Sequence, residues 1–86
     1  MRVTILYHPK SEQARGVEDF AHDIEAQQGV KPELLSLDTR EGAAMATLYD
    51  ITQYPSIVVS REDGGVIQTW SGEQLPLMNE VAAYAR

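Results

Sequence analysis

The sequence predicts an α/β domain with the element order β-α-β-α-β-β-α. Short runs of β-branched and aromatic residues alternate with segments whose apolar residues recur at the helical period. An Asp63-Gly64-Gly65 turn joins the last two strand-like runs, so these two strands are expected to form an antiparallel hairpin. We therefore expect one domain over residues 1–86, with a four-stranded mixed sheet and helices on both of its faces.

The first strand and the first helix have clear boundaries in the sequence. Val3 to Tyr7 is β-branched and aromatic, and Pro9 ends this strand. Lys10 to Gln28 is predicted to be helical, with Ser11 as the N-cap and Gly29 as the residue that ends it. The apolar face of this helix comprises Ala14, Val17, Ala21, Ile24 and Gln28, with Phe20 beside Ala21.

The remaining elements follow from the same rules. We expect strands at 33–37, 56–60 and 66–70 and helices at 40–49 and 75–84. The strand at 33–37 is apolar on both faces over part of its length, as buried strands are. Asp38 or Thr39 is expected to cap the second helix, whose buried side is expected to include Ala44, Met45 and Leu48. The last helix is expected to have Pro76 in its first turn and to bury Leu75, Met78, Val81, Ala82 and Ala85.

One glycine breaks the helical pattern. Gly16 falls inside the first predicted helix, where glycine costs about 1 kcal/mol relative to alanine. We therefore expect Gly16 to mark a place where another backbone approaches closely.

Composition excludes several classes of function. The chain has no cysteine, which removes disulfides, thiolate nucleophiles, iron–sulfur clusters and cysteine-type zinc sites. Its formal net charge is −6, so it lacks the basic surface that drives binding to nucleic acids and to anionic membranes. No apolar run reaches the ~20 residues of a transmembrane helix, and the apolar start is too short for a signal peptide. We expect a cytoplasmic protein without nucleic-acid or membrane partners.

Several segments together resemble the thioredoxin-like superfamily in its short, glutaredoxin-like form. Tyr49 to Val58 is similar to that family's aromatic and β-branched run before a cis-proline and a Thr or Ser. Val3 to Ser11 resembles the strand and the Pro-x-Cys approach of glutaredoxins, and Trp70-Ser71-Gly72 is similar to the glycine that follows the hairpin. The resemblance implies a minimal thioredoxin-like fold over nearly the whole chain, with Pro55 in the cis form.

The chain departs from this family at the catalytic motif. The Cys-x-x-Cys positions fall on Ser11, Glu12, Gln13 and Ala14, so both thiols are missing. Thiol–disulfide exchange needs a thiolate that attacks sulfur, and a serine hydroxyl cannot replace it. We therefore expect a degenerate, redox-inactive member with no catalytic residue, no cofactor and no thiol–disulfide oxidoreductase activity.

The predicted binding site lies beside Pro55. In active relatives the backbone of the residue before the cis-proline receives an extended peptide or glutathione, which implies that role for Tyr54. Tyrosine is also enriched at protein interfaces. The expected patch for a protein or peptide partner comprises His8, Pro9, Ser11, Tyr54, Pro55 and Ser56. Two alternatives to a binding patch remain. Pro55 could be an inherited turn with no binding role, and the Tyr54 ring could fold back onto the first helix.

Two other functions stay open from the sequence. Ser11 could hold a bound thiolate as serine-type glutathione transferases do, giving a transferase-like domain or weak glutathione binding. A structural homo-oligomer would use the edge strand near Val66–Trp70. His8 and His22 suggest a metal site, but His22 and its acidic neighbours fall on a face expected to be solvated, so we expect none.

Overall fold

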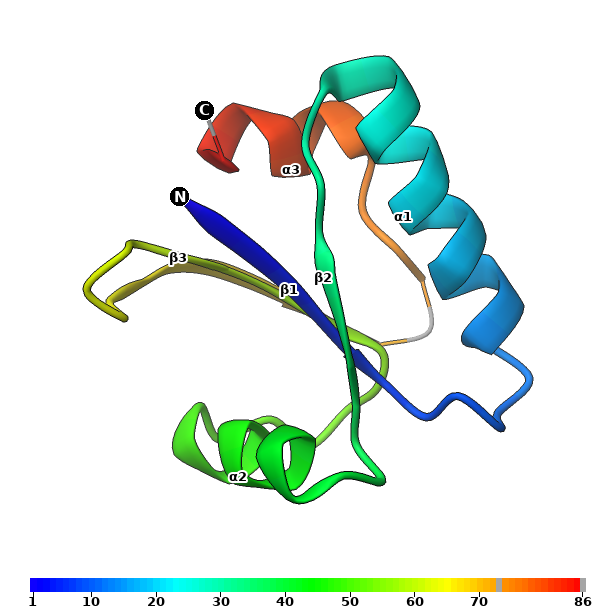
Figure 1. Ribbon diagram of the computed structural model, residues 1–86, viewed down its shortest axis with the longest axis vertical. Helices are drawn as coiled ribbons and strands as arrows, with labels where there is room; N and C mark the ends of the chain where they lie inside the picture. The colour runs from blue at the N-terminus through cyan, green and yellow to red at the C-terminus, as the bar shows by residue number, and fades with distance from the viewer. Residues whose placement is uncertain (73, 86) are drawn as a thin grey trace.

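The computed structural model, which describes residues 1–72 and 74–85, has the predicted order of elements (Figure 1). The four strands are β1 (Arg2–Tyr7), β2 (Glu33–Ser36), β3 (Ser56–Ser60) and β4 (Val66–Ser71). The three helices are α1 (Ala14–Gln28), α2 (Arg40–Leu48) and α3 (Met78–Ala85). The predicted α/β class and the element order β-α-β-α-β-β-α are thereby confirmed.

The strands form one mixed sheet in the order β2-β1-β3-β4. β1 runs parallel to β2 and antiparallel to β3, and β3 and β4 form the antiparallel hairpin that was predicted. The carboxylate of Asp63 accepts a hydrogen bond from the Gly65 N–H at 3.0 Å, and Arg61 N–H donates to the Gly65 carbonyl at 2.7 Å. β2 and β4 are therefore the two edge strands of the sheet.

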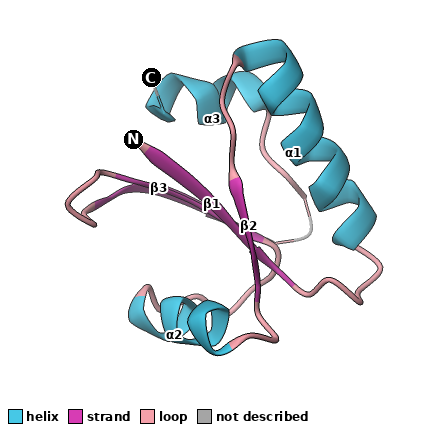
Figure 2. Ribbon diagram, in the orientation of Figure 1, coloured by secondary structure: helices cyan, strands magenta, loops and turns pink. Residues whose placement is uncertain are grey.

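Helices cover both faces of the sheet, as predicted (Figure 2). α1 and α3 pack on the face that carries Val3, Ile5, Tyr7, Ile57 and Val59, and α2 packs on the face that carries Leu6 and Val58. β3 is buried along its whole length, because it is a central strand with a helix layer on each side. The end of β1 at Tyr7 and the start of β3 at Ser56 lie at the same end of the sheet, where the predicted site falls.

α1 begins later than predicted. Its first helical residue is Ala14 rather than Lys10, and its N-cap position is Gln13 rather than Ser11. The Ser11 hydroxyl donates to the His8 carbonyl at 2.7 Å, so it closes a turn and does not cap the helix. Gly29 ends α1 in the left-handed conformation, as predicted.

α2 buries a different face from the one that was predicted. Thr39 caps this helix by accepting a hydrogen bond from the Gly42 N–H at 3.1 Å, which confirms one of the two predicted caps. The buried residues are Gly42 and Ala46, whereas Ala44 and Leu48 are exposed and Met45 is half-buried. Gly42 rather than Gly16 is the glycine of close approach, because a Cβ on Gly42 would overlap the carbonyl oxygen of Ser36.

Two further predictions need correction. β2 is an edge strand whose Glu33 and Leu34 are exposed, so it is not buried under helices on both faces. α3 begins at Met78, three residues later than predicted, and Pro76 therefore lies before the helix rather than in its first turn. Val81 and Ala82 are buried, and Leu75, Met78 and Ala85 pack against the core in partly buried positions.

Candidate functional site

Hydrogen bonds to neighbouring segments fix the turn that leads into β3. The peptide bond between Tyr54 and Pro55 is cis. The Pro55 carbonyl accepts a hydrogen bond from the Gly72 N–H at 3.1 Å, which ties this turn to the end of β4. The buried Ser56 hydroxyl donates to the Gln53 carbonyl at 2.8 Å and lies 2.9 Å from the Ser71 hydroxyl oxygen. Pro55 and Ser56 are both buried, so their side chains pack between the turn and the protein interior.

Tyr54 is the residue of this turn that reaches the surface. Its ring is half-buried and meets the His8 ring edge to face, with 5.3 Å between the ring centres and an interplanar angle of 81°. Its hydroxyl donates a long hydrogen bond of 3.4 Å to the Ile51 carbonyl. The backbone N–H and C=O of Tyr54 form no hydrogen bond within residues 1–72 and 74–85. The turn thus presents one open donor and one open acceptor.

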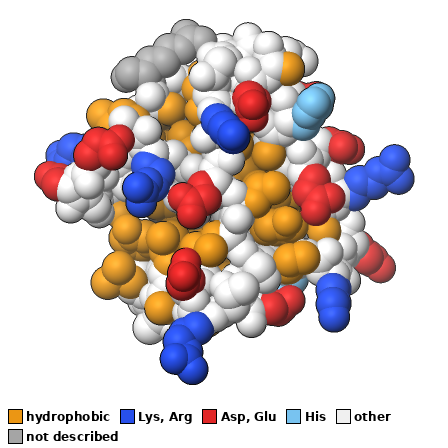
Figure 3. Space-filling model, viewed as in Figure 1, with side chains coloured by type: hydrophobic (Ala, Val, Ile, Leu, Met, Phe, Trp, Pro, Cys, Tyr) orange, Lys and Arg blue, Asp and Glu red, His pale blue; other side chains and the backbone are white. Residues whose placement is uncertain are grey.

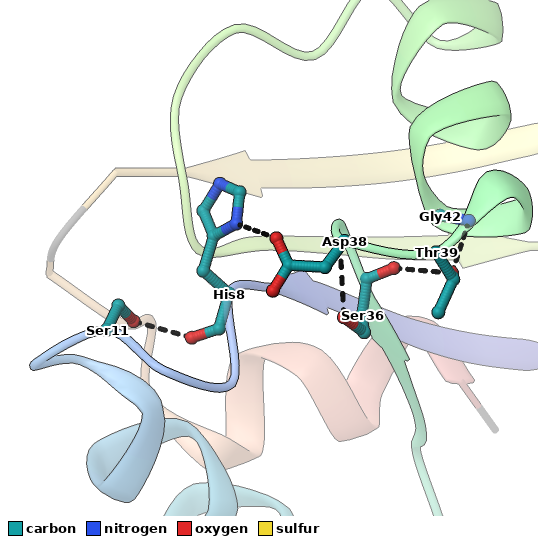
Figure 4. Close-up of polar contacts among 6 residues, drawn as sticks. All are labelled: His8, Ser11, Ser36, Asp38, Thr39 and Gly42. Carbon is teal, nitrogen blue, oxygen red and sulfur yellow. Dashed lines mark hydrogen bonds and ion pairs between the residues drawn. The ribbon is translucent and has the colours of Figure 1, made fainter.

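His8 follows the last residue of β1 and connects Tyr54 to the start of α2. Its Nδ1 lies 3.1 Å from the Asp38 carboxylate (Figure 4). Both side chains are about half exposed, at 45% and 55%. The Asp38 N–H donates to the Ser36 hydroxyl at 3.1 Å, which positions that carboxylate. A polar contact this exposed stabilises the fold by about 1 kcal/mol at most, so its main effect is to orient the His8 ring.

The four positions that the sequence resemblance matched to a Cys-x-x-Cys motif lie in the turn before α1 and in its first residue. The His8 carbonyl accepts both the N–H of Ser11, at 3.0 Å, and its hydroxyl, at 2.7 Å. The Ser11 hydroxyl proton is therefore already used by the fold. Pro9 and Glu12 are exposed, and Ala14 is buried as the first residue of α1. The N-cap at Gln13 makes no side-chain capping bond.

A hollow of about 400 Å³ lies between α2 and the turn before β3. Two of the predicted site residues, His8 and Tyr54, contribute to its wall. The other lining residues, which sequence reasoning missed, are Leu37, Ala43, Ala46, Thr47, Asp50 and Ile51. Asp50 has a left-handed backbone (φ 60°), a conformation in which aspartate is enriched, so its place after a helix was a usable signal. A second hollow, of about 490 Å³, lies at the opposite end of β1 around Arg2 and Glu62.

Neither a metal centre nor a membrane span is found in the described part of the chain. Within residues 1–72 and 74–85, no group of three His, Asp or Glu side chains is placed to hold a metal ion. His22 is exposed on α1, away from the turn at Tyr54. No helix among the same residues combines the length and the apolar character that crossing a bilayer requires.

Similarity to known proteins is visible in the fold and not in the sequence. No family model matches the chain, and no curated protein is similar to it in sequence. Thioredoxin 1 of Thermosipho africanus superposes with a TM-score of 0.69 at 11% identity, over 98% of this chain and 89% of that one. The oxidised thioredoxin of Plasmodium falciparum gives 0.70 at 15% identity, over 99% and 83%.

A third structure contains the first two thioredoxin domains of Saccharomyces cerevisiae Eps1p. It superposes with a TM-score of 0.65 at 14% identity, and the match covers 99% of this chain and 33% of that one. All three structures match the complete path from β1 to α3, which agrees with the four-stranded mixed sheet and its helix layers. The chain therefore has the thioredoxin-like superfamily fold, built without a cysteine.

Proposed function

We propose that this chain is a redox-inactive thioredoxin-like module that binds an extended peptide segment of a partner protein at the Tyr54 turn. A thioredoxin-like fold without any cysteine has no thiolate for disulfide exchange. The function that is left to the site is binding, and the open backbone N–H and C=O of Tyr54 are the observation that carries the proposal.

Backbone groups of this kind suit an extended peptide. One residue of a bound segment can donate to the Tyr54 carbonyl and accept from its N–H, which is the pattern of strand addition. Because these are main-chain bonds, they supply affinity with little dependence on the peptide's sequence. The contacts of the buried Ser56 hydroxyl support this use, since they hold the turn in place before any peptide binds.

Selectivity would come from the hollow beside the turn. An aromatic edge-to-face pair, Tyr54 and His8, forms one wall, and the apolar Leu37 and Ile51 also line it. A hollow of about 400 Å³ accommodates one large side chain of the bound segment. Its rim also carries Asp50 and Thr47, which can accept hydrogen bonds from that side chain.

The geometry of Ser11 does not favour the glutathione alternative. A serine that holds a thiolate must donate its hydroxyl proton to sulfur, but the Ser11 hydroxyl donates to the His8 carbonyl at 2.7 Å. Ser11 also lies outside α1, so it does not stand at the N-terminus of the helix. We therefore restrict the proposal to peptide binding.

The test uses peptides displayed from a random library and selected on the purified protein. A selected peptide should shift the backbone amide resonance of Tyr54 in NMR titrations, and Tyr54→Ala should weaken its binding at least about tenfold, or ~1.4 kcal/mol. N-methylation of the peptide's contacting amide should weaken binding similarly, because it removes the donor to the Tyr54 carbonyl.

Tyr84→Ala is the matched control for this experiment. Tyr84 also makes one edge-to-face aromatic contact, with Trp70 at 5.6 Å, but it lies on α3 away from the turn. This variant should retain full peptide affinity. The proposal fails if selected peptides shift resonances elsewhere, or if Tyr54→Ala and Tyr84→Ala bind equally well. Reduction of insulin disulfides by the purified chain would contradict the redox-inactive part.

A further inference from the structure

β2 leaves one row of backbone groups open at the edge of the sheet. The Leu37 N–H donates to the Tyr7 carbonyl of β1 at 2.9 Å. Backbone groups alternate along a strand, so Leu35 and Glu33 also face β1. By the same alternation, Leu34 and Ser36 direct their N–H groups away from β1, toward the unpaired side of β2.

The open row has an uneven pattern of donors and acceptors. The Ser36 carbonyl is already used, because it accepts the Thr39 hydroxyl at 2.7 Å and the Thr39 N–H at 3.2 Å. Pro32, the residue two positions before Leu34, is buried and has no N–H, so it adds no donor to the open row. The edge therefore offers the N–H groups of Leu34 and Ser36 and the carbonyl of Leu34.

We infer that this edge binds a second copy of the same chain, as an antiparallel pair of β2 strands centred on Leu34. In that register the two Leu34 residues exchange two hydrogen bonds, each N–H donating to the carbonyl of the other copy. The inference does not require peptide binding at the Tyr54 turn, and the residue that the two share is Asp38, whose carboxylate also lies 3.1 Å from His8 Nδ1.

Apolar surface flanks the edge on both sides (Figure 3). On the α1 side Leu34 is 38% exposed, and two Leu34 side chains would meet at the two-fold axis. On the α2 side a hollow of about 390 Å³ is lined partly by Leu35, Met45 and the 74% exposed Leu48. The register places Leu35 of the second copy opposite Glu33, at the rim of this hollow.

Charge at the two ends of the strand favours a second copy over an unrelated strand. The exposed Lys31 precedes β2, and the exposed Asp38 follows it. In a two-fold antiparallel pair the start of each strand lies beside the end of the other, so each Lys31 comes beside the Asp38 of the other copy. The pair thus brings opposite charges together twice.

The other edge is less suited to this pairing. β4, where a homo-oligomer was expected from the sequence, pairs with β3 through a register shift at Val59/Ser60. Such a bulge twists an edge strand and interrupts its regular row of backbone groups. The structure therefore favours β2 over the segment Val66–Trp70.

Sedimentation equilibrium over a concentration series tests the inference. The wild-type chain should form dimers at high concentration, and Leu34→Lys should raise the dissociation constant about tenfold or more, because it places two like charges at the axis. Val66→Lys is the matched control, since Val66 is 42% exposed on the other edge strand, and it should dimerise as the wild type does. A chain that stays monomeric at millimolar concentration overturns the inference, as does a dimer that only Val66→Lys dissociates.

Charge reversal gives a second test that does not depend on Leu34. Lys31→Glu alone and Asp38→Lys alone should each weaken self-association. An equimolar mixture of the two variants should form a heterodimer with a dissociation constant close to that of the wild-type dimer, because opposite charges again meet at both ends of the paired strands. No heterodimer above the level of either homodimer would overturn the proposed register.

Discussion

Gly42→Ala is expected to destabilise the protein although alanine is the better helix former. Gly42 lies in the first turn of α2, which rests directly on the end of β2. A methyl group there would overlap the Ser36 carbonyl oxygen and lie 3.2 Å from the Leu37 Cα. All of these are backbone atoms, so no side-chain rotation relieves the overlap and α2 must move as a unit.

The size of the effect follows from three contributions. Overpacking of this kind costs about 1–3 kcal/mol. A displaced α2 also weakens the 3.1 Å bond from the Gly42 N–H to the Thr39 hydroxyl, a cap worth about 1 kcal/mol. Alanine's higher helix propensity returns about 1 kcal/mol. The net loss is about 1–3 kcal/mol, which lowers the melting temperature by roughly 5–20 °C in a domain of this size.

Gly16→Ala is the matched control, and far-UV circular dichroism with heat and urea is the assay. Gly16 is exposed in α1, and a Cβ there meets no atom within 4 Å. This variant should gain about 0.5–1 kcal/mol from helix propensity and lower unfolded-state entropy. If Gly42→Ala melts at or above the temperature of Gly16→Ala, the close packing of α2 on β2 is wrong.

Three further predictions concern buried and titrating groups. Ser56→Ala should lower the free energy of unfolding by about 1–2 kcal/mol in urea titrations, because it removes the two hydrogen bonds of the buried Ser56 hydroxyl. Burial, and to a smaller extent the Glu18 carboxylate, raises the pKa of Tyr7. The stability that the protonated Tyr7 contributes is therefore complete at neutral pH and is lost as the pH rises through the raised pKa. In ultraviolet titration Glu18→Gln should move the Tyr7 midpoint to lower pH, and an unchanged midpoint would refute the coupling. The Gly65 N–H lowers the pKa of Asp63, so NMR should show its carboxylate protonating below the usual aspartate range, and the turn should weaken as the pH falls through that pKa.

Most of the architecture could be predicted from local patterns, for physical reasons that act within a few residues. The β-branched run at 56–60, the Asp63-Gly64-Gly65 turn and Gly29 specify a strand, a hairpin and a helix end through backbone conformation alone. The order of such elements then limits the sheet to few topologies, so the mixed sheet and its two helix layers could also be predicted.

The predictions from sequence were wrong where a residue could form either of two local contacts. Ser11 could cap α1 or close a turn, and the choice depends on where the chain leaves β1 at His8. The buried side of α2 depends on how this helix rests on Ser36, which places Gly42 and Ala46 inward and leaves Leu48 exposed. Periodicity specifies an apolar stripe, but the contact with another element selects which stripe is buried.

The sequence alone determined that thiol chemistry is absent, since no fold can restore a missing thiol group. It also indicated Tyr54 and His8, though not that their rings meet or that Asp38 orients the histidine. Those contacts join residues about 30 to 46 positions apart, and they depend on β1, β2 and β3 ending at the same side of one sheet. The free edge of β2 is likewise a property of strand order, because a strand's own residues do not encode which neighbour it lacks.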